Sequence, residues 1–187
     1  MLIVLVGASG TGKSTIENEI CKMTDFKKIV SWTTRAPRPG EVNGVDYYFT
    51  NNEEFLKELD SMAEWEEYSF NRYYGTMKMQ YDNDKELVTV LTPHGVRQIK
   101  KNMPELKMFV VYVTAPLKDK AIRYINRCGD NLSYSDMSEL GARIERDFGM
   151  FKGFEDEADF VIDNPDGTRI HELVFQIMSK YRKEKNT

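Results

Sequence analysis

Residues 7–14 read Gly7-Ala8-Ser9-Gly10-Thr11-Gly12-Lys13-Ser14, directly after the apolar run from Leu2 to Val6. A Gly, four further residues and then Gly-Lys-Ser form the phosphate-loop pattern, which requires a buried strand before it and a helix after it. Backbone N–H groups of the loop and of the helix start can converge on phosphates, because a helix N-terminus favours negative charge. The segment therefore predicts a nucleotide site on a strand–loop–helix unit.

The side chains of this loop have separate expected roles. Lys13 should reach the β and γ phosphates of a nucleotide, and Ser14 should supply a hydroxyl to Mg²⁺. The alternative, a glycine-rich turn with a surface lysine, is disfavoured by the flanking strand and helix patterns. The expected nucleotide-binding residues of this loop are Gly7, Ala8, Ser9, Gly10, Thr11, Gly12, Lys13, Ser14 and Thr15.

Composition limits the classes of protein and partner. The 187 residues are 41% hydrophobic and 30% charged, with a formal net charge of −4 and a pI near 5.4. This acidic balance argues against a general nucleic-acid surface, and two cysteines, Cys21 and Cys128, favour a reducing compartment. The apolar N-terminal run is too short for a signal peptide, and no stretch approaches a membrane span. We expect a cytoplasmic monomer or homodimer whose partners are small-molecule nucleotides, with no nucleic-acid or membrane partner.

Strand and helix patterns alternate through most of the chain. Strands are expected at 2–6, 29–31, 87–91, 108–113 and 160–162, and helices at 13–23, 95–102, 117–127 and 168–183. In the 117–127 helix, Ala121, Ile122 and Ile125 should face inward. Strands joined through helices pair in parallel. The sequence therefore predicts an α/β fold of phosphate-loop (P-loop) type, with three layers around a central parallel sheet.

Two segments interrupt this alternation. Residues 32–80 predict a β-rich insertion, with a strand at 46–50, a helix capped at Thr50 and a hairpin over 63–74. Residues 128–150 predict a helical lid that starts with a polar stretch and a capping box at Ser133. We expect a single domain over 1–187, with its core at 1–31 and 81–187.

A second group of polar residues lies in the expected insertion. Arg35 and Arg38 flank Pro37, and planar guanidinium groups match phosphate oxygens. The hydroxyls of Tyr47 and Tyr74 could add donors. A solvated arginine pair is the alternative, which a neighbouring phosphate loop disfavours. Further arginines that could close over transferring phosphates lie on the two helices around the polar stretch: Arg123, Arg127, Arg143 and Arg146.

The run Ser31-Trp32-Thr33-Thr34-Arg35-Ala36-Pro37-Arg38-Pro39-Gly40-Glu41-Val42-Asn43-Gly44-Val45-Asp46-Tyr47 resembles the substrate-binding signature of guanylate kinases. Further matching residues are the phosphate loop through Thr15, Glu64-Trp65, Tyr73-Tyr74-Gly75-Thr76, Arg123, Arg127 before Gly129, Arg143 and Asn164. This resemblance spans nearly the whole chain. It implies an ATP-dependent nucleoside monophosphate kinase that uses Mg²⁺.

The resemblance also implies roles for individual residues. Glu64 and Thr76 would read the acceptor base, Arg127 and Arg143 would bridge the donor and acceptor phosphates, and Asn164 would lie by the donor adenine. Lys13 and Arg35 join those two arginines in the expected catalytic set. Residues implied to hold the GMP phosphate are Ser31, Arg35, Arg38, Tyr47 and Tyr74.

Guanine suits a carboxylate such as that of Glu64, which can accept from N1–H and the 2-amino group, whereas adenine has no donor at N1. Glu64 could instead be an exposed acid beside Glu66 and Glu67. No general base is needed, because the attacking oxygen belongs to an ionised phosphate. Catalysis then reduces to in-line placement and charge neutralisation, and closure of the lid would exclude water.

The chain departs from the family pattern in two places. The usual Asp-x-Asp after the central strand is replaced by Val90 and Thr92, so Thr92 offers the base pocket only a neutral hydroxyl. One extra residue lies between Glu64 and Tyr74, which affects the register of the hairpin.

Three functions are therefore weighed. The first is phosphorylation of GMP, together with dGMP, by ATP. The second is a related kinase for another nucleoside monophosphate or a ribose phosphate. The third is a guanylate-kinase-like interaction module without activity, which the intact Lys13 and Ser14 disfavour.

Overall fold

A parallel sheet of five strands forms the centre of the protein, with the order β2-β7-β1-β8-β9. The computed structural model describes residues 1–38, 40–69, 71–82, 85–129 and 132–186. The strands are β1 (Leu2–Val6), β2 (Lys27–Lys28), β7 (Leu87–Leu91), β8 (Met108–Thr114) and β9 (Phe160–Asp163). All their pairings are parallel, which confirms the predicted α/β fold with a central parallel sheet.

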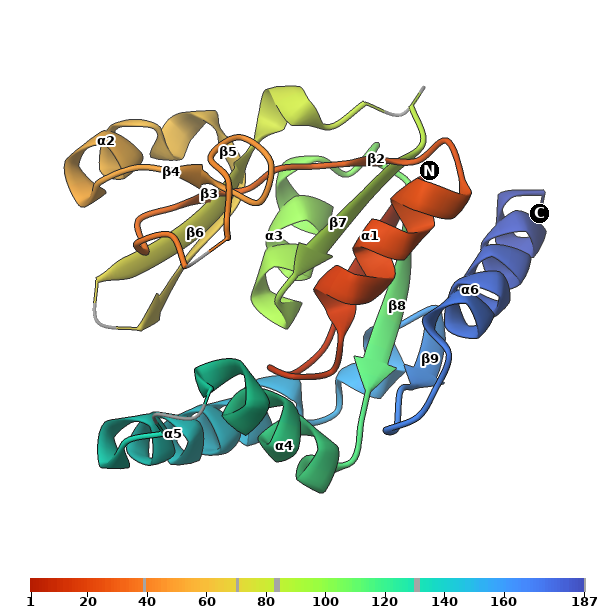
Figure 1. Ribbon diagram of the computed structural model, residues 1–187. Helices are drawn as coiled ribbons and strands as arrows, with labels where there is room; N and C mark the ends of the chain where they lie inside the picture. The colour runs from red at the N-terminus through yellow and green to blue at the C-terminus, as the bar shows by residue number, and fades with distance from the viewer. Residues whose placement is uncertain (39, 70, 83–84, 130–131, 187) are drawn as a thin grey trace.

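Helices cover both faces of this sheet, because alternate residues of each buried strand point to opposite sides. On β1, Val4 packs in a cluster with Val96 and Ile99 of α3, whereas Ile3 packs in a cluster with α1 and α6. Figure 1 shows α1 and α6 together on one side of the sheet. The main helices are α1 (Lys13–Met23), α3 (Pro93–Asn102), α4 (Leu117–Cys128), α5 (Tyr134–Phe151) and α6 (Ile170–Lys185).

A second sheet, of four strands in the order β4-β3-β6-β5, lies beside α3. Its strands are β3 (Trp32–Thr33), β4 (Tyr48–Phe49), β5 (Met62–Ser69) and β6 (Arg72–Met77), and α2 (Asn52–Lys57) packs on it through Phe55. β5 and β6 form the predicted antiparallel hairpin. The Gln98 side chain on α3 bonds both backbone groups of Trp65, accepting at 2.8 Å and donating at 3.0 Å, which fixes this sheet to the core.

α4 and α5 form a helical pair opposite the small sheet, below it in Figure 1. The predicted capping box at Ser133 is confirmed: its hydroxyl accepts from the Asp136 backbone N–H while Asp136 accepts from Ser133. At the far end of α5, Phe151 stacks on Tyr112, and Phe154 of a short 3₁₀ helix, η3 (Phe154–Glu157), meets the same ring edge-on. These contacts join the C-terminal end of α5 to β8.

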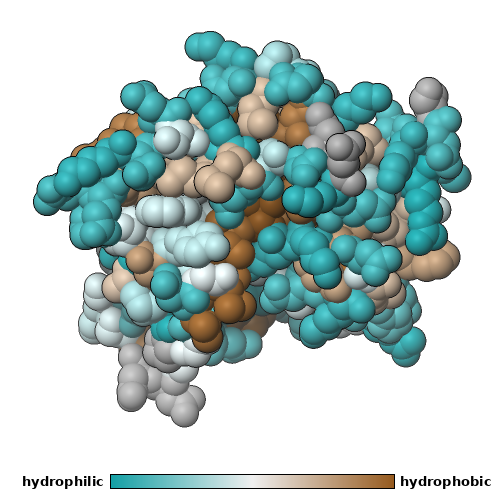
Figure 2. Space-filling model, turned by 90° about the horizontal axis from the view of Figure 1, so that it is seen from above, coloured by the Kyte–Doolittle hydropathy of each residue, from teal (hydrophilic) through white to brown (hydrophobic). Residues whose placement is uncertain are grey.

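The face drawn in Figure 2 is mostly hydrophilic, with hydrophobic residues mainly in a strip across its centre. Among the described residues, no helix is both long enough and apolar enough to cross a bilayer.

Four local predictions were wrong. The segment 29–31 is not a strand, since β2 ends at Lys28, and the strand expected over 46–50 is only Tyr48–Phe49. Asn51, not Thr50, caps α2, because its side-chain oxygen accepts from Glu54 N at 2.9 Å. On α4 the buried side chain is Tyr124, whereas Ile122 is 42% exposed.

Candidate functional site

The phosphate loop connects β1 to α1, and close packing requires two of its glycines. A Cβ on Gly7 would lie 2.3 Å from the backbone oxygen of Val113 on β8. Gly12, at the start of α1, has φ +90, and a Cβ there would lie 2.5 Å from Asn164 Nδ2. The loop therefore lies directly on the ends of β8 and β9.

Inside the loop, the Ala8 carbonyl holds the turn together. It accepts from Thr11 Oγ1 at 3.0 Å and from Lys13 Nζ at 2.8 Å. Burial lowers the pKa of Lys13 to about 8, a shift that the carboxylate of Asp147 partly opposes. The Lys13 ammonium is thus a desolvated cation held inside the loop, where a phosphate would gain most from it.

Two side chains brace the loop from outside. The Asn164 side chain, only 2% exposed, donates to the Thr11 carbonyl at 2.8 Å. Arg123 donates to the carbonyl of Gly10 at 3.1 Å and to that of Asn164 at 2.9 Å. Asn164 therefore supports the loop in this structure, and its proximity to a donor adenine stays a prediction.

Asp147 on α5 was missed by the sequence analysis. Its Oδ2 accepts from the Ser9 backbone N–H at 2.7 Å, and the residue is 7% exposed. The carboxylate therefore occupies a loop N–H that a phosphate oxygen could use. A signal was present, because Asp147 shares the buried face of α5 with Leu140 and Phe151, at helical spacings of seven and four. A buried acid on such a face needs a partner.

A cavity of about 420 Å³ extends from the phosphate loop to the small sheet. Thr76 does not line this cavity, because its side chain is fully buried behind it. Its hydroxyl oxygen lies 2.9 Å from that of Ser31. The predicted site residues that line the cavity are Gly7, Ser9, Lys13, Ser14, Ser31, Arg35, Arg38, Tyr47, Glu64, Tyr74, Thr92 and Arg127. The others are Ala8, Gly10, Thr11, Gly12, Thr15, Thr76, Arg143 and Asn164.

The basic part of the cavity contains an internal counter-ion. Arg35 forms two bonds of 2.9 Å to the carboxylate of Glu41, and Arg38 Nη1 lies 3.9 Å from the same group. The Arg35 guanidinium also lies 5.4 Å from the centre of the Tyr47 ring, and burial raises the pKa of Tyr47 to about 12. Glu41 therefore fixes the orientation of Arg35 while Tyr47 keeps its hydroxyl proton as a donor.

At the other end of the cavity, Glu64 is buried rather than exposed. It is 6% exposed, which excludes the alternative of a solvated acid. Burial raises the pKa of the Glu64 carboxyl to about 7, partly opposed by a hydrogen bond with Thr76. This end of the cavity thus presents a desolvated acceptor.

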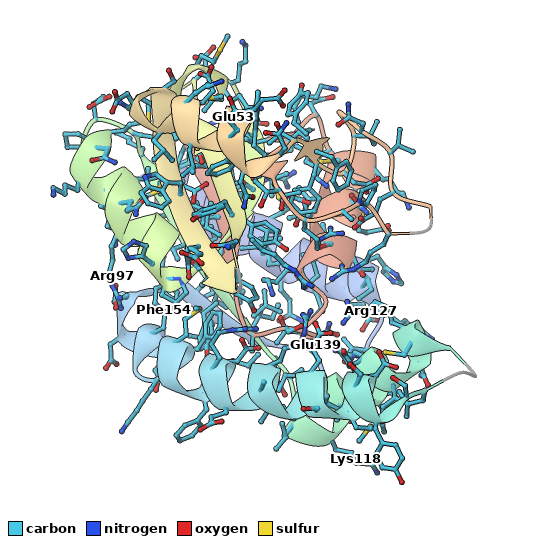
Figure 3. All side chains as sticks on the ribbon, turned by 90° about the vertical axis from the view of Figure 1, so that its left-hand side faces the viewer. Glu53, Arg97, Lys118, Arg127, Glu139 and Phe154 are labelled. Atoms are coloured by element: carbon cyan, nitrogen blue, oxygen red, sulfur yellow. The ribbon has the colours of Figure 1, made fainter. Side chains whose placement is uncertain are left out.

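The arginines of the helical pair are divided between two cavities. Arg127 lines the 420 Å³ cavity, and its pKa is lowered by burial and by the charges of Arg38 and Arg143. Arg143 lines a separate cavity of about 360 Å³ between α4 and α5 and forms an ion pair with Glu139. Figure 3 shows Arg127 and Glu139 between α5 and the small sheet. An anion between these cations would relieve their mutual repulsion.

The metal expectation can be tested against the side chains at the loop. Ser14 is exposed and lines the cavity next to Lys13. Val90, at the end of β7, lines it without a carboxylate, and within the described segments no three His, Cys, Asp or Glu side chains gather as a metal cage. The donor set fits a Mg²⁺ that takes one hydroxyl from the protein and its other oxygens from phosphates and water.

Sequence comparisons with known proteins identify the family of the chain. The guanylate kinase family profile matches residues 1–181. The guanylate kinase of Lactiplantibacillus plantarum is 40% identical over 141 residues, covering 71% of this chain and 68% of that protein. That of Bacillus subtilis is 33% identical over 174 residues, covering 88% and 80%.

A solved structure supports the fold independently. The crystal structure of guanylate kinase from Anaplasma phagocytophilum gives a TM-score of 0.67 at 24% identity and covers 98% of this chain and 85% of that chain. The shikimate kinase of Acinetobacter baumannii, solved with shikimate, gives a TM-score of 0.55 at 15% identity, covering 100% and 95%. On the sequence evidence, the chain belongs to the guanylate kinase family.

Proposed function

We propose that the protein transfers the terminal phosphoryl group of ATP to GMP, yielding ADP and GDP. One observation carries this proposal: a single cavity runs from Lys13 of the phosphate loop, past Arg127 and Arg38, to the buried Glu64. The cations in the middle of the cavity suit the phosphate of a nucleotide that enters base first, and the hydrogen-bond acceptor at the far end suits its base.

On the donor side, residues 7–15 would bind the phosphates of ATP through backbone N–H groups and Lys13. Ser14 would hold Mg²⁺, which when bound neutralises phosphate charge. Asn164 would keep the loop in shape beside the adenine. We propose that the loop presents the terminal phosphoryl group to the cavity.

On the acceptor side, Arg35 and Arg38 would hold the GMP phosphate, with donors from Ser31, Tyr47 and Tyr74. The attacking oxygen belongs to an ionised phosphate, so no side chain has to remove a proton. Lys13 and Arg127 would neutralise charge on the moving group. Such preorganised positive groups supply most of the catalysis in phosphoryl transfer.

Selection of guanine would come from Glu64 and Thr76. The Glu64 carboxylate accepts from N1–H and the 2-amino group, whereas the bare N1 of adenine would repel it. A carboxylate left without its donors is costly in a buried site, so AMP should be strongly disfavoured. These contacts involve the base and the phosphate rather than the 2′-hydroxyl, so we expect dGMP to be accepted too.

We also propose a division of labour within the single domain. The small sheet over 32–80 would bind the acceptor, and the segment 128–150 would act as a lid. Closure of that lid would bring Arg143 from its ion pair with Glu139 toward the phosphates. Cys21 and Cys128 are free thiols, which suits a cytoplasmic protein acting on free nucleotides as a monomer or homodimer.

A coupled assay of ADP release tests this function. ATP and Mg²⁺ are supplied with GMP, dGMP, AMP, UMP or CMP in turn, and Lys13→Ala serves as the blank. We expect turnover with GMP and dGMP only. Turnover of another acceptor would indicate a related kinase. Absence of turnover with every acceptor would favour an interaction module.

A further inference from the structure

A second acid, Glu66, lines the same cavity as Glu64. The two residues are two positions apart on β5, so their side chains lie on the same face of the strand. Glu64 pairs across the hairpin with Thr76, and Glu66 with Tyr74. Glu67, the next residue, is exposed and pairs with Tyr73, so it belongs to the opposite face.

Thr92 holds the Glu66 carboxylate in place. Its Oγ1 donates to Glu66 Oε2 at 2.5 Å. The same oxygen accepts from the Gly95 backbone N–H at 3.1 Å, because Thr92 is the N-cap of α3. With a lone pair used by Gly95, the only proton of the hydroxyl goes to Glu66. The carboxylate is therefore oriented by a helix start rather than by a flexible contact.

The pair of carboxylates is electrostatically unfavourable without a ligand. Glu66 is among the causes that raise the pKa of Glu64, after burial. Such an arrangement is relieved by a neutral ligand that brings several hydrogen-bond donors and no acceptor to the same edge.

The Watson–Crick edge of guanine has that pattern on one side. N1–H and one hydrogen of the 2-amino group can both bond Glu64, and the second hydrogen of the amino group points away toward a further acceptor. Hypoxanthine retains N1–H but lacks the amino group. Glu64 alone therefore loses one hydrogen bond when hypoxanthine replaces guanine, and a second carboxylate next to it adds a further contact that only guanine can make.

We propose that Glu66 is a specificity-determining residue that accepts a hydrogen bond from the 2-amino group of the acceptor guanine, with Thr92 as its positioning residue. The proposal rests on the GMP kinase function proposed above. It assigns N1–H mainly to Glu64 and the amino group to both acids.

Comparison of GMP with IMP tests this assignment. In the ADP-release assay, kcat/KM is measured for both acceptors with the wild-type protein, Glu66→Ala, Glu66→Gln and the matched control Glu67→Gln. We expect Glu66→Ala to lower the GMP/IMP preference about tenfold, mainly through KM for GMP, with the KM for ATP unchanged. Glu66→Gln, which keeps an acceptor oxygen, should lose less, and Glu67→Gln should match the wild type.

Thr92→Val provides a second route to the same answer, since it removes the hydroxyl that orients Glu66. We expect a smaller loss of GMP/IMP preference, about threefold. Thr92→Val also removes the helix cap, and thermal unfolding measures the stability that is lost with this cap. A GMP/IMP preference unchanged within about twofold in Glu66→Ala would overturn the proposal.

Direct titration separates this proposal from the proposed function. Binding of GMP and IMP without ATP gives the same preference even where no turnover occurs. Absence of GMP turnover together with a Glu66-dependent binding preference would reject the kinase reaction and keep the role of Glu66. Equal affinity of the wild-type protein for GMP and IMP would reject the role of Glu66 alone.

Discussion

One continuous segment, residues 7–15, makes the phosphate loop, whereas the cavity beside it draws Ser31, Glu64 and Arg127 from separate elements. The loop is held at its own backbone carbonyls: that of Ala8 accepts from side chains inside the loop, and that of Thr11 accepts from the Asn164 side chain outside it. The cavity is shaped by side chains, several of them charged. A backbone site tolerates many substitutions nearby, so changes in acceptor choice should arise in the cavity and not in the loop.

Lys13 gives the largest expected effect and tests whether the two regions are separable. Lys13→Ala removes the half-buried cation of the loop, and we expect kcat to fall by about 10³-fold. GMP affinity, measured by calorimetry, should change by less than about twofold if the cavity binds independently. Lys22→Ala, which changes an exposed lysine of α1, is the matched control. A parallel loss of GMP affinity would show that the two regions do not bind separately.

Glu64 tests the cavity in the same way. We expect Glu64→Gln to raise the KM for GMP about tenfold to hundredfold and to relax discrimination against AMP, with the KM for ATP unchanged. Unchanged GMP preference would contradict the base-reading role.

The same variant should lose less stability than the wild type as pH rises from 4.5 to 7. The pKa of Glu64 is raised from its ordinary 4.5 to about 7 in the folded protein, so its contribution to stability is complete below pH 4.5 and is lost as pH rises through 7. Thermal unfolding of wild type and Glu64→Gln should therefore diverge between these values. Parallel melting curves across this range would contradict the raised pKa.

The pH dependence of GMP affinity gives the next effect in size. Guanine needs the ionised carboxylate, whereas burial raises the pKa of Glu64 to about 7 in the free protein. GMP binding must then release a proton below pH 7, and affinity should fall by up to about tenfold per pH unit below that value. Calorimetry in buffers of different ionisation enthalpy counts the proton. Glu64→Gln retains only the titration of the GMP phosphate, so an equal count in both proteins would contradict the prediction.

The sequence predicted the loop better than the cavity, for a physical reason. The strand at 2–6, the loop and the helix at 13–23 are local, so their pattern is complete within one short segment. Thr92 and Glu66 meet across 26 residues, and that contact depends on how β5 packs on α3. The prediction that Ile122 faces inward was wrong for the same reason, because helical spacing alone did not reveal which side of α4 is covered.

Asp147 should have a smaller effect, and it probes the side of the loop that the sequence analysis missed. Its carboxylate accepts from Ser9 N at 2.7 Å, so an incoming phosphate must displace a negative charge. We expect Asp147→Asn to tighten ATP binding by about threefold to tenfold. Glu145→Gln, an exposed acid on the same helix, is the control. Weaker ATP binding in Asp147→Asn would mean that the carboxylate organises the loop instead of competing for it.

Val90 should give the smallest effect, because it changes only the metal response. It lies at the end of β7, paired with Leu5 just before the loop, and lines the cavity. A carboxylate there could hold a water of Mg²⁺, so Val90→Asp should lower the Mg²⁺ concentration for half-maximal activity by about twofold to fivefold. Val90→Asn, similar in size but uncharged, is the control, and calorimetric Mg²⁺–ADP titration gives a readout apart from turnover. An unaltered titration in a folded Val90→Asp protein would mean that Ser14 and the phosphates already set metal affinity. Side chains next to the loop would then affect donor binding less than the side chains around Glu64 affect acceptor binding.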